Sequence, residues 1–291
     1  MQKRILDEAA NAAPRFVDRQ LAARATNSGI LSSPMAFKLE NPPIIEAWIR
    51  ATMASAPESE WKWSDVFNML TEYGDDYPVL ESLPEFTPTP KGLDRNQLPE
   101  EIEIHVAPRY ARTRSVDRTK IVQVGRHELL VIHGRANDQP YPGFEKLFKA
   151  FLDAVRRYRE HVPTMGIESV ELHYADLIVI PDLYTEEREI GDYFVGAPDF
   201  PAEPFGAVGS VSWSALLSCP GSQDFAQVSV QMQPPDGNDG RFRLDWHRWC
   251  PGVPPDDIRA IENRLHSAHN YLNLCFQAIC REPVWNLFDP S

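Results

Sequence analysis

The sequence predicts an α+β protein made of antiparallel sheets in two similar halves, each packed by one long amphipathic helix. Short runs that alternate apolar and polar residues, such as EIEIHV and FAQVSVQMQ, are typical of half-buried strands. Turn residues separate neighbouring runs by a few positions, which favours hairpins. Two segments, about 143–160 and 256–281, carry apolar residues at helical spacing. Helical stripes of this kind close the core of a sheet by covering one of its faces.

The first half spans residues 39–183 and follows an N-terminal extension over residues 1–38. IIEAWIRA, after Pro42-Pro43, begins with β-branched residues and predicts a strand. The next segment, 61–73, has the spacing of a helix. A Pro-rich insertion over about 74–99 predicts a loop or an extended arm rather than a packed element. Further strands follow from Glu100, with a hairpin turn at 125–128, the first long helix, and a strand from Gly166 to Pro181.

The second half, residues 184–291, repeats this pattern. AVGSVSWSALLSC, FAQVSVQMQ and RFRLDWHRW predict strands joined by turns that contain Gly, Pro, Asn and Asp. The second long helix follows, with Ile258, Ile261, Leu265, Leu272, Phe276 and Ile279 on one face. Each half therefore places strands beside one substantial helix.

Charge and composition argue against several classes of function, although nucleic-acid binding through Arg112 and Arg114 stays a third possibility. The formal net charge is −13 with a pI near 5.1, and no run of Lys and Arg offsets it, which disfavours binding to nucleic acid. No apolar run approaches the roughly 18 residues of a membrane span, and charged residues interrupt the N-terminus where a signal peptide needs an apolar stretch. The four cysteines form no CxxC pair and predict reduced, buried thiols. We therefore expect a cytoplasmic protein.

Several landmarks occur in order along the chain: NPPIIEA (41–47), IVQVGRHELLVIH (121–133), YPGFEKL (141–147), SVELHYADLIVIP (169–181), IGDYF (190–194) and the terminal CFQAICREPVWNLF. Together they resemble a sporadically distributed family of uncharacterised bacterial proteins, whose members carry NPPIVEA-like, VQxG, YPGW and LRYxNxIxIP motifs. The resemblance covers about residues 39–288. It departs from the pattern at Asp176 and Leu177, which stand near the usual Ile-Asn, and at His133, where Asn is common. It implies the fold and the compartment, and it supplies no catalytic residue.

A basic strip is one candidate binding site. The run RYARTRSVDRTK places Arg112 and Arg114 on one face of a strand, where two guanidinium groups suit a carboxylate, a phosphate or an acidic partner. The alternative is a solvated strand face whose arginines pair with surface acids.

Aromatic residues supply the other candidates for a ligand or partner. Trp61 and Trp63 lie beside the Pro-rich segment and suit an anchor at a protein interface, although most tryptophans of this chain should be core. Tyr141 opens the Tyr-Pro-Gly sequence that sets the start of a helix. Tyr174 lies in the middle of a strand, where core or sheet surface is the commoner role.

A metal site is the weaker alternative. Asp245 and His247 share one face of a strand, opposite Trp246, and His269 lies on a flank of the terminal helix. If strand and helix pack together, the three side chains would form a set of two histidines and a carboxylate, which suits a metal ion. No HxH, HxxxH or HExxH spacing supports this set, and histidines at the boundary of the core with ordinary hydrogen-bond partners are the favoured explanation of His247 and His269.

The sequence therefore favours a non-catalytic intracellular binding protein that recognises a protein partner, without a cofactor. GxSxG, GxGxxG and GxxxxGK[ST] are all missing, which argues against the commonest hydrolase and nucleotide sites. The alternative is a small-ligand or metal-dependent enzyme with a pocket between the sheet and the C-terminal helix. A homo-oligomer is compatible with either function.

Overall fold

The computed structural model describes residues 42–54, 60–91, 101–136, 140–161, 166–184, 189–197, 211–219, 222–253 and 257–288, except for the side chains of 85–91 and 101–107. The expected N-terminal extension, residues 1–38, lies outside the described residues. Within the described residues, no helix combines the length and the apolar character needed to cross a bilayer.

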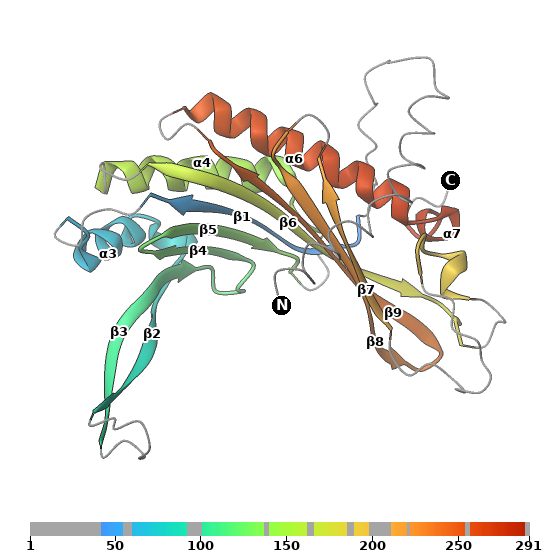
Figure 1. The fold of residues 1–291 in the computed structure, drawn as a ribbon, viewed down its shortest axis with the longest axis horizontal. Helices are drawn as coiled ribbons and strands as arrows, with labels where there is room; N and C mark the ends of the chain where they lie inside the picture. The colour runs from blue at the N-terminus through green and yellow to red at the C-terminus, as the bar shows by residue number, and fades with distance from the viewer. Residues whose placement is uncertain are drawn as a thin grey trace, which may run out of the picture.

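The described strands form one mixed-length antiparallel sheet in the order β2-β3-β4-β5-β1-β6-β9-β8-β7 (Figure 1). Every neighbouring pair in this order is antiparallel. The strand bounds are β1 Ile44–Met53, β2 Val79–Lys91, β3 Glu101–Arg114, β4 Lys120–Gly125, β5 Glu128–Gly134, β6 Ile167–Ile180, β7 Ser212–Ser218, β8 Phe225–Asp236 and β9 Asp239–Pro251.

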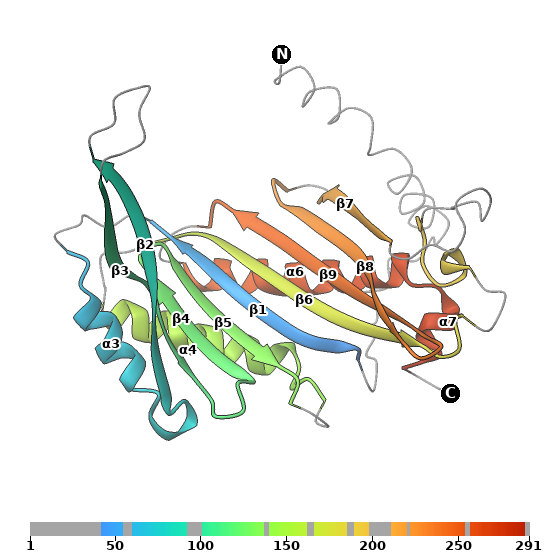
Figure 2. The ribbon, with the colours of Figure 1, turned by 90° about the horizontal axis from the view of Figure 1, so that it is seen from below.

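The helices gather on one face of this sheet, and Figure 2 views the molecule from the other face. Helix α4 packs on β5 and β1, α6 packs on β6 and β9, and α3 packs against α4. The helix bounds are α3 Trp63–Thr71, α4 Phe144–His161, α6 Ile258–Ile279 and α7 Glu282–Trp285, with short 3-10 turns at Gly74–Asp76 and Ile190–Asp192.

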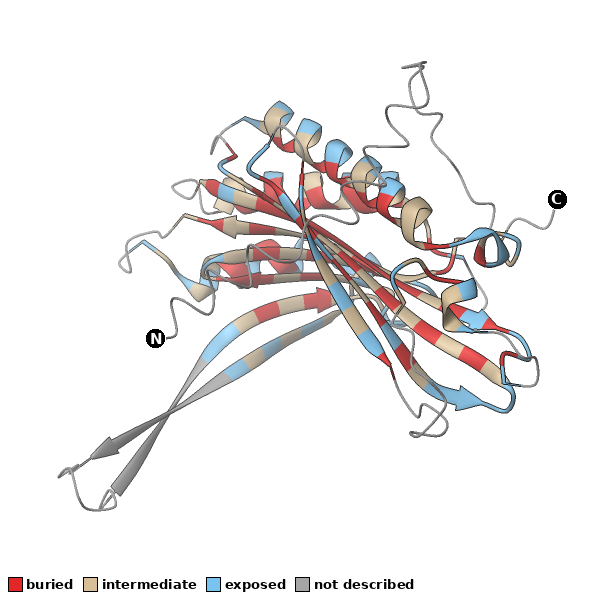
Figure 3. Ribbon diagram, turned by 45° about the vertical axis from the view of Figure 1, so that its right-hand side comes forward, coloured by how far each residue is buried: buried red, intermediate tan, exposed pale blue. Residues whose placement is uncertain are grey.

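Alternation along the strands positions the core. In β9 every second residue is buried, and the buried set that faces α6 includes Phe242, Leu244 and Trp246 (Figure 3). The two long helices bury the predicted apolar stripes, with Phe151 in α4 and Leu265 in α6 completely buried. Each Å² of apolar surface removed from water contributes roughly 25 cal/mol to the free energy of folding. The apolar layer between the sheet and the two long helices is therefore the main source of stability. The predicted amphipathic helices are confirmed.

The expectation of separate antiparallel sheets is wrong, because β1 and β6 join all the described strands into one sheet. β6 pairs with β1 on one side and with β9 on the other. Glu46 to Thr52 of β1 continue the ladder to β5 on its far side. The sheet therefore runs without a break across the boundary that the sequence suggested near residue 183.

The Pro-rich segment, expected to be a loop or an extended arm rather than a packed element, contains an edge strand. Residues 79–91 form β2, an edge strand paired with β3 over its whole length. In an edge strand every second N–H points away from the sheet, and prolines at those positions remove no ladder hydrogen bond. Pro84, Pro88 and Pro90 have an even spacing, and a register shift at Leu83 and Pro84 absorbs an irregularity. An edge position therefore explains how a Pro-rich sequence forms a strand.

Candidate functional site

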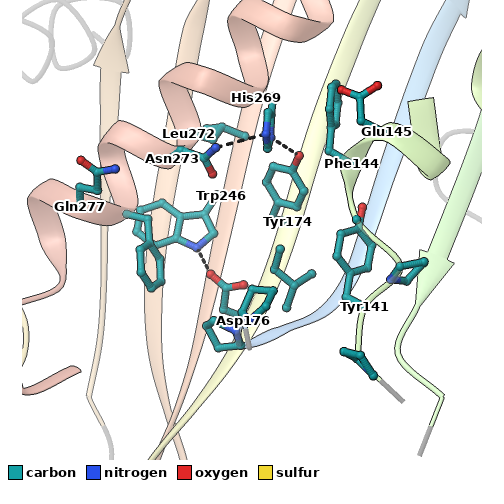
Figure 4. Close-up of a pocket in the computed structure, with 17 residues that line it drawn as sticks. Tyr141, Phe144, Glu145, Tyr174, Asp176, Trp246, His269, Leu272, Asn273 and Gln277 are labelled. Carbon is teal, nitrogen blue, oxygen red and sulfur yellow. Dashed lines mark hydrogen bonds between the residues drawn. The ribbon is translucent and has the colours of Figure 1, made fainter. Parts of the chain in front are cut away.

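A cavity of about 620 Å³ lies between the central strands of the sheet and α6 (Figure 4). Small-molecule sites in proteins commonly measure about 300–1,000 Å³. The wall is formed by the start of β1, the turn before α4, β6, β9 and α6. The lining residues are Pro42, Pro43, Ile44, Pro140, Tyr141, Pro142, Gly143, Phe144, Glu145, Tyr174, Asp176, Trp246, His269, Leu272, Asn273, Phe276 and Gln277.

Strand alternation directs the polar groups of the sheet into this cavity. Tyr174 and Asp176 lie two residues apart on β6, and Tyr174 is the register partner of Trp246 on β9. Side chains two apart on a strand point to the same face, so all three face α6. The residue between the two on β6, Ala175, pairs with Asp245 on the face away from the helices.

Asp176 is a buried carboxyl with a strongly raised pKa at the wall of the cavity. Only 3% of the residue is exposed, and its Oδ2 accepts a hydrogen bond of 2.7 Å from the indole Nε1 of Trp246. Its Oδ1 is buried and has no hydrogen-bond partner among the described residues. Burial raises the pKa of this carboxyl from 3.8 to about 7, although the bond from Trp246 opposes the shift. The group therefore exchanges its proton near neutral pH.

Tyr174 and His269 form a second polar pair in the same cavity. The Tyr174 hydroxyl lies 2.7 Å from Nδ1 of His269, and the Asn273 amide nitrogen lies 3.2 Å from Nε2. The imidazole also stacks on the ring of Phe144, with 4.3 Å between the ring centroids. Burial lowers the pKa of His269 to about 4, so the ring is neutral at pH 7. The pair is thus a neutral hydrogen-bonded unit.

Tyr141 reaches the cavity from the turn that precedes α4. Gly143 adopts a φ of +94°, a conformation that residues with a Cβ rarely take, and α4 begins at the next residue. The predicted role of Tyr-Pro-Gly in starting this helix is therefore confirmed. The hydroxyl of Tyr141 is buried and has no hydrogen-bond partner among the described residues. It leaves a second polar group at the cavity wall available to a ligand.

The wall combines a titratable carboxyl with mainly apolar side chains. A carboxyl with a pKa near 7 can donate or accept a proton at neutral pH. The described lining residues include no Ser, Thr, Cys or Lys, which are common covalent nucleophiles. Most of the wall is aromatic or aliphatic, with a few polar groups among them, as in sites that hold organic molecules.

The structure brings some of the sequence candidates together and separates others. Tyr141, Tyr174 and His269 meet in the cavity (Figure 4). Arg112 and Arg114 lie elsewhere, on β3 at the opposite face of the sheet. Both bind Glu81 of β2, at 2.6 Å and 2.8 Å. The two guanidinium groups thus have an acidic partner within the chain, as the alternative of a solvated, paired strand face predicts.

Trp61 and Trp63 belong to the packing of α3 on α4. Their rings meet edge to face at 5.7 Å, and the ring of Trp61 lies 6.4 Å from that of Tyr158 in α4. Both tryptophans are partly buried against the core. Their contacts therefore account for them as structural anchors of the helix layer.

The structure does not bring Asp245, His247 and His269 together. His269 lies on the helix side of the sheet, whereas the other two lie on the opposite face, which no described helix covers and which we call the uncovered face. There Asp245 pairs with His173 at 3.2 Å, and His247 pairs with Glu171 at 2.8 Å. No group of three His, Cys, Asp or Glu side chains suited to a metal ion occurs within the described ranges. The strand alternation was predicted correctly, but the other face of β9 is the one that meets α6.

Sequence reasoning missed Asp176 and Trp246 as members of a site. Asp176 interrupts the apolar run LHYADLIVI, and an acidic residue inside a buried strand indicates a functional position. In the sequence this residue also departs from the LRYxNxIxIP motif of the resembling family. Trp246 carries no signal of its own, because tryptophan is common in cores.

No protein-family model matches this chain, and no curated protein shows significant similarity to it.

Proposed function

We propose that the chain is a binding protein that holds a small organic molecule in the cavity between β6, β9 and α6. One observation supports this above all others: Asp176 lies at the wall of a 620 Å³ cavity with one buried carboxylate oxygen unpaired among the described residues. A buried polar atom without a partner costs about 1–3 kcal/mol, and a bound molecule that donates a hydrogen bond removes this cost. The proposal keeps the binding role that the sequence favours. It places the ligand between the sheet and the C-terminal helix, where the alternative interpretation of the sequence expects an enzyme pocket.

The position of the cavity fits a chain of two similar halves, which we include in the proposal. The similarity is clearest if β6 is assigned to the second half instead of the first. In each half the first strand then pairs with the last strand before the long helix: β1 pairs with β5 before α4, and β6 pairs with β9 before α6. The cavity then lies where the start of α4 meets α6. Ligand sites occur preferentially at such junctions. The cytoplasm is the proposed compartment, supported by four cysteines that are all free and buried.

Saturation-transfer NMR with a library of aromatic fragments tests this function. The variant Asn273→Trp directs an indole into the cavity from a half-buried position of α6, and Leu274→Trp adds the same group at the next residue, which is 45% exposed. We expect fragments that bind the wild-type protein and Leu274→Trp to lose their signal with Asn273→Trp. Thermal melting checks that both variants fold. Fragments that bind all three proteins equally would place binding outside the cavity and contradict the proposal.

Recognition of a protein partner is the second candidate, and the face of the sheet without described helices supports it (Figure 2). Leu216 of β7 is 68% exposed and Phe225 of β8 is 39% exposed, and Phe225 stacks on Trp249 of the same face. Exposed apolar side chains that cluster in this way often mark interaction surfaces. Light scattering after size exclusion measures self-association. A monomer that retains no partner in affinity purification, or a partner retained equally by the double variant Leu216→Asp/Phe225→Asp, would refute this candidate.

A further inference from the structure

We propose that the ligand of this cavity is an organic amine, bound as a cation with its nitrogen at Asp176 and its flat apolar body against the aromatic wall. This inference rests on the proposed function and specifies the chemical class of its ligand. Three features of the wall support it: the sign of its side-chain charges, the unpaired oxygen of Asp176, and the aromatic side chains that line the same cavity.

The side-chain charges of the wall favour a cation over an anion. The described lining residues contain two carboxyl groups, Asp176 and Glu145, and no Lys or Arg. His269 is the remaining titratable base, and burial lowers its pKa to about 4, so it adds no positive charge at neutral pH. Carboxylates and phosphates usually need Arg, Lys or converging backbone N–H groups. The net charge of −13 also attracts cations to the protein as a whole.

Asp176 provides a carboxylate oxygen that can accept a hydrogen bond at the wall of the cavity. Trp246 occupies Oδ2, which leaves Oδ1 buried and unpaired among the described residues. An ionised carboxylate removed from water is stabilised by a nearby cation that also donates a hydrogen bond. An ammonium group satisfies both requirements. A neutral hydroxyl or amide group satisfies only the hydrogen bond and leaves the charge uncompensated.

Aromatic side chains from four segments complete an amine site. Tyr141 lines the cavity from the turn before α4 and Phe144 from the first residue of that helix (Figure 4). Tyr174 lines it from β6, Trp246 from β9, and Phe276 from α6. Aromatic faces attract cations, by about 0.5–2 kcal/mol for each well-placed ring. The same faces stack on a flat apolar group. The unpaired hydroxyl of Tyr141 offers a second acceptor for an N–H group.

Three matched probes test the class of ligand by isothermal titration calorimetry: 2-(1-naphthyl)ethylamine, 2-(1-naphthyl)ethanol and 1-naphthylacetate. They share the aromatic body and differ in the terminal group, which is a cation, a neutral hydroxyl or an anion. We expect the amine to bind about tenfold to a hundredfold more tightly than the alcohol, as is typical of a hydrogen bond between charged groups. The acid should bind least tightly.

The variant Asp176→Asn removes the charge and keeps an acceptor for Trp246. We expect it to lower the affinity of the amine to that of the alcohol and to leave the affinity of the alcohol unchanged within about twofold, because only the charged partner is lost. Asp245→Asn, on the uncovered face of the sheet, is the matched control and should bind the amine as the wild-type protein does. Raising the pH from 6 to 8 should strengthen binding of the amine, which stays protonated in this range, because Asp176 ionises.

The outcomes separate the two proposals. If the alcohol or the acid binds as tightly as the amine, and Asn273→Trp abolishes that binding, the cavity holds a ligand but the amine class is wrong. Equal affinity of the amine for Asp176→Asn and the wild-type protein overturns the amine class as well. If no probe binds the wild-type protein, or if binding survives Asn273→Trp, both the amine class and the proposed function fail.

Discussion

Burial of Asp176 predicts a stability that decreases as the pH rises. The pKa of this carboxyl is about 7 in the folded chain and 3.8 when exposed. Between these values the folded state holds a proton that the unfolded state has released, so stability falls with rising pH. The difference between these two pKa values lowers the free energy of unfolding by about 4 kcal/mol in total, and about 2.5 kcal/mol of this loss falls between pH 5 and pH 8. Above pH 8 the contribution is constant.

Asp176→Asn isolates this contribution. The amide cannot ionise, so the free energy of unfolding of the variant minus that of the wild-type protein should grow by about 2.5 kcal/mol from pH 5 to pH 8. Urea unfolding at four pH values measures this difference, and other titrating groups cancel because both proteins contain them. Asp245→Asn is the control. Hydrogen bonds from His173 and Arg243 outweigh burial and hold the pKa of Asp245 at about 2, so this carboxyl does not itself titrate in this range. The difference for Asp245→Asn should therefore change much less, because only the weaker charge coupling between Asp245 and Asp176 is lost. A constant difference for Asp176→Asn, or one that shrinks, would refute the reasoning.

Three further predictions concern the stability of the fold and the site. Asp224→Ala should lower the free energy of unfolding, measured in urea, by about 3–5 kcal/mol. Arg248 is 4% exposed and bonded to Asp224 at 2.7 Å, so the variant would leave a buried charge without its carboxylate partner. A loss below about 1 kcal/mol would contradict this prediction. Phe151→Ala should lower the same free energy by about 3–5 kcal/mol, because it leaves a cavity in the core. Leu216→Ala, at an exposed position, should change it by less than about 0.5 kcal/mol. Equal effects of the two variants would show that Phe151 of α4 is not part of the packed core. The imidazole of His269 should keep the NMR chemical shifts of its neutral form from pH 8 to pH 5, since its pKa is about 4. The stability linked to this group is fully present above pH 6.5 and is lost as the pH falls towards 4. Titration of His269 near pH 6.5 would disprove its burial.

The elements that sequence reasoning predicted well are those with a local pattern. The stripes of α4 and α6 and the alternation of β9 depend on residues within one element, and their periods of 3.6 and 2 are visible in the sequence. The hairpin of β4 and β5 depends on the short turn at 125–128. These features need no knowledge of distant parts of the chain.

Features that depend on distant residues were not predicted. The pairing of β1 with β6 joins segments more than 100 residues apart and decides that one sheet forms. The strand β2 depends on its position at an edge, which the local sequence does not reveal.

The same limit explains the error at β9. Alternation separated Asp245 and His247 from Trp246 correctly, but it could not say which set faces α6. Arg248 faces the helix layer because Asp224, far away in the sequence, neutralises it there. The acidic residue Asp176 could have been recognised as a candidate from its apolar surroundings, whereas its bond to Trp246 and its place at a cavity could not.

A crystal structure of the protein with 2-(1-naphthyl)ethylamine tests the central claim most directly. We predict the naphthyl ring between β6, β9 and α6, with the ammonium nitrogen about 3 Å from Oδ1 of Asp176. Binding of the amine on the uncovered face of the sheet, or in the cavity with its nitrogen directed away from Asp176, would contradict the account.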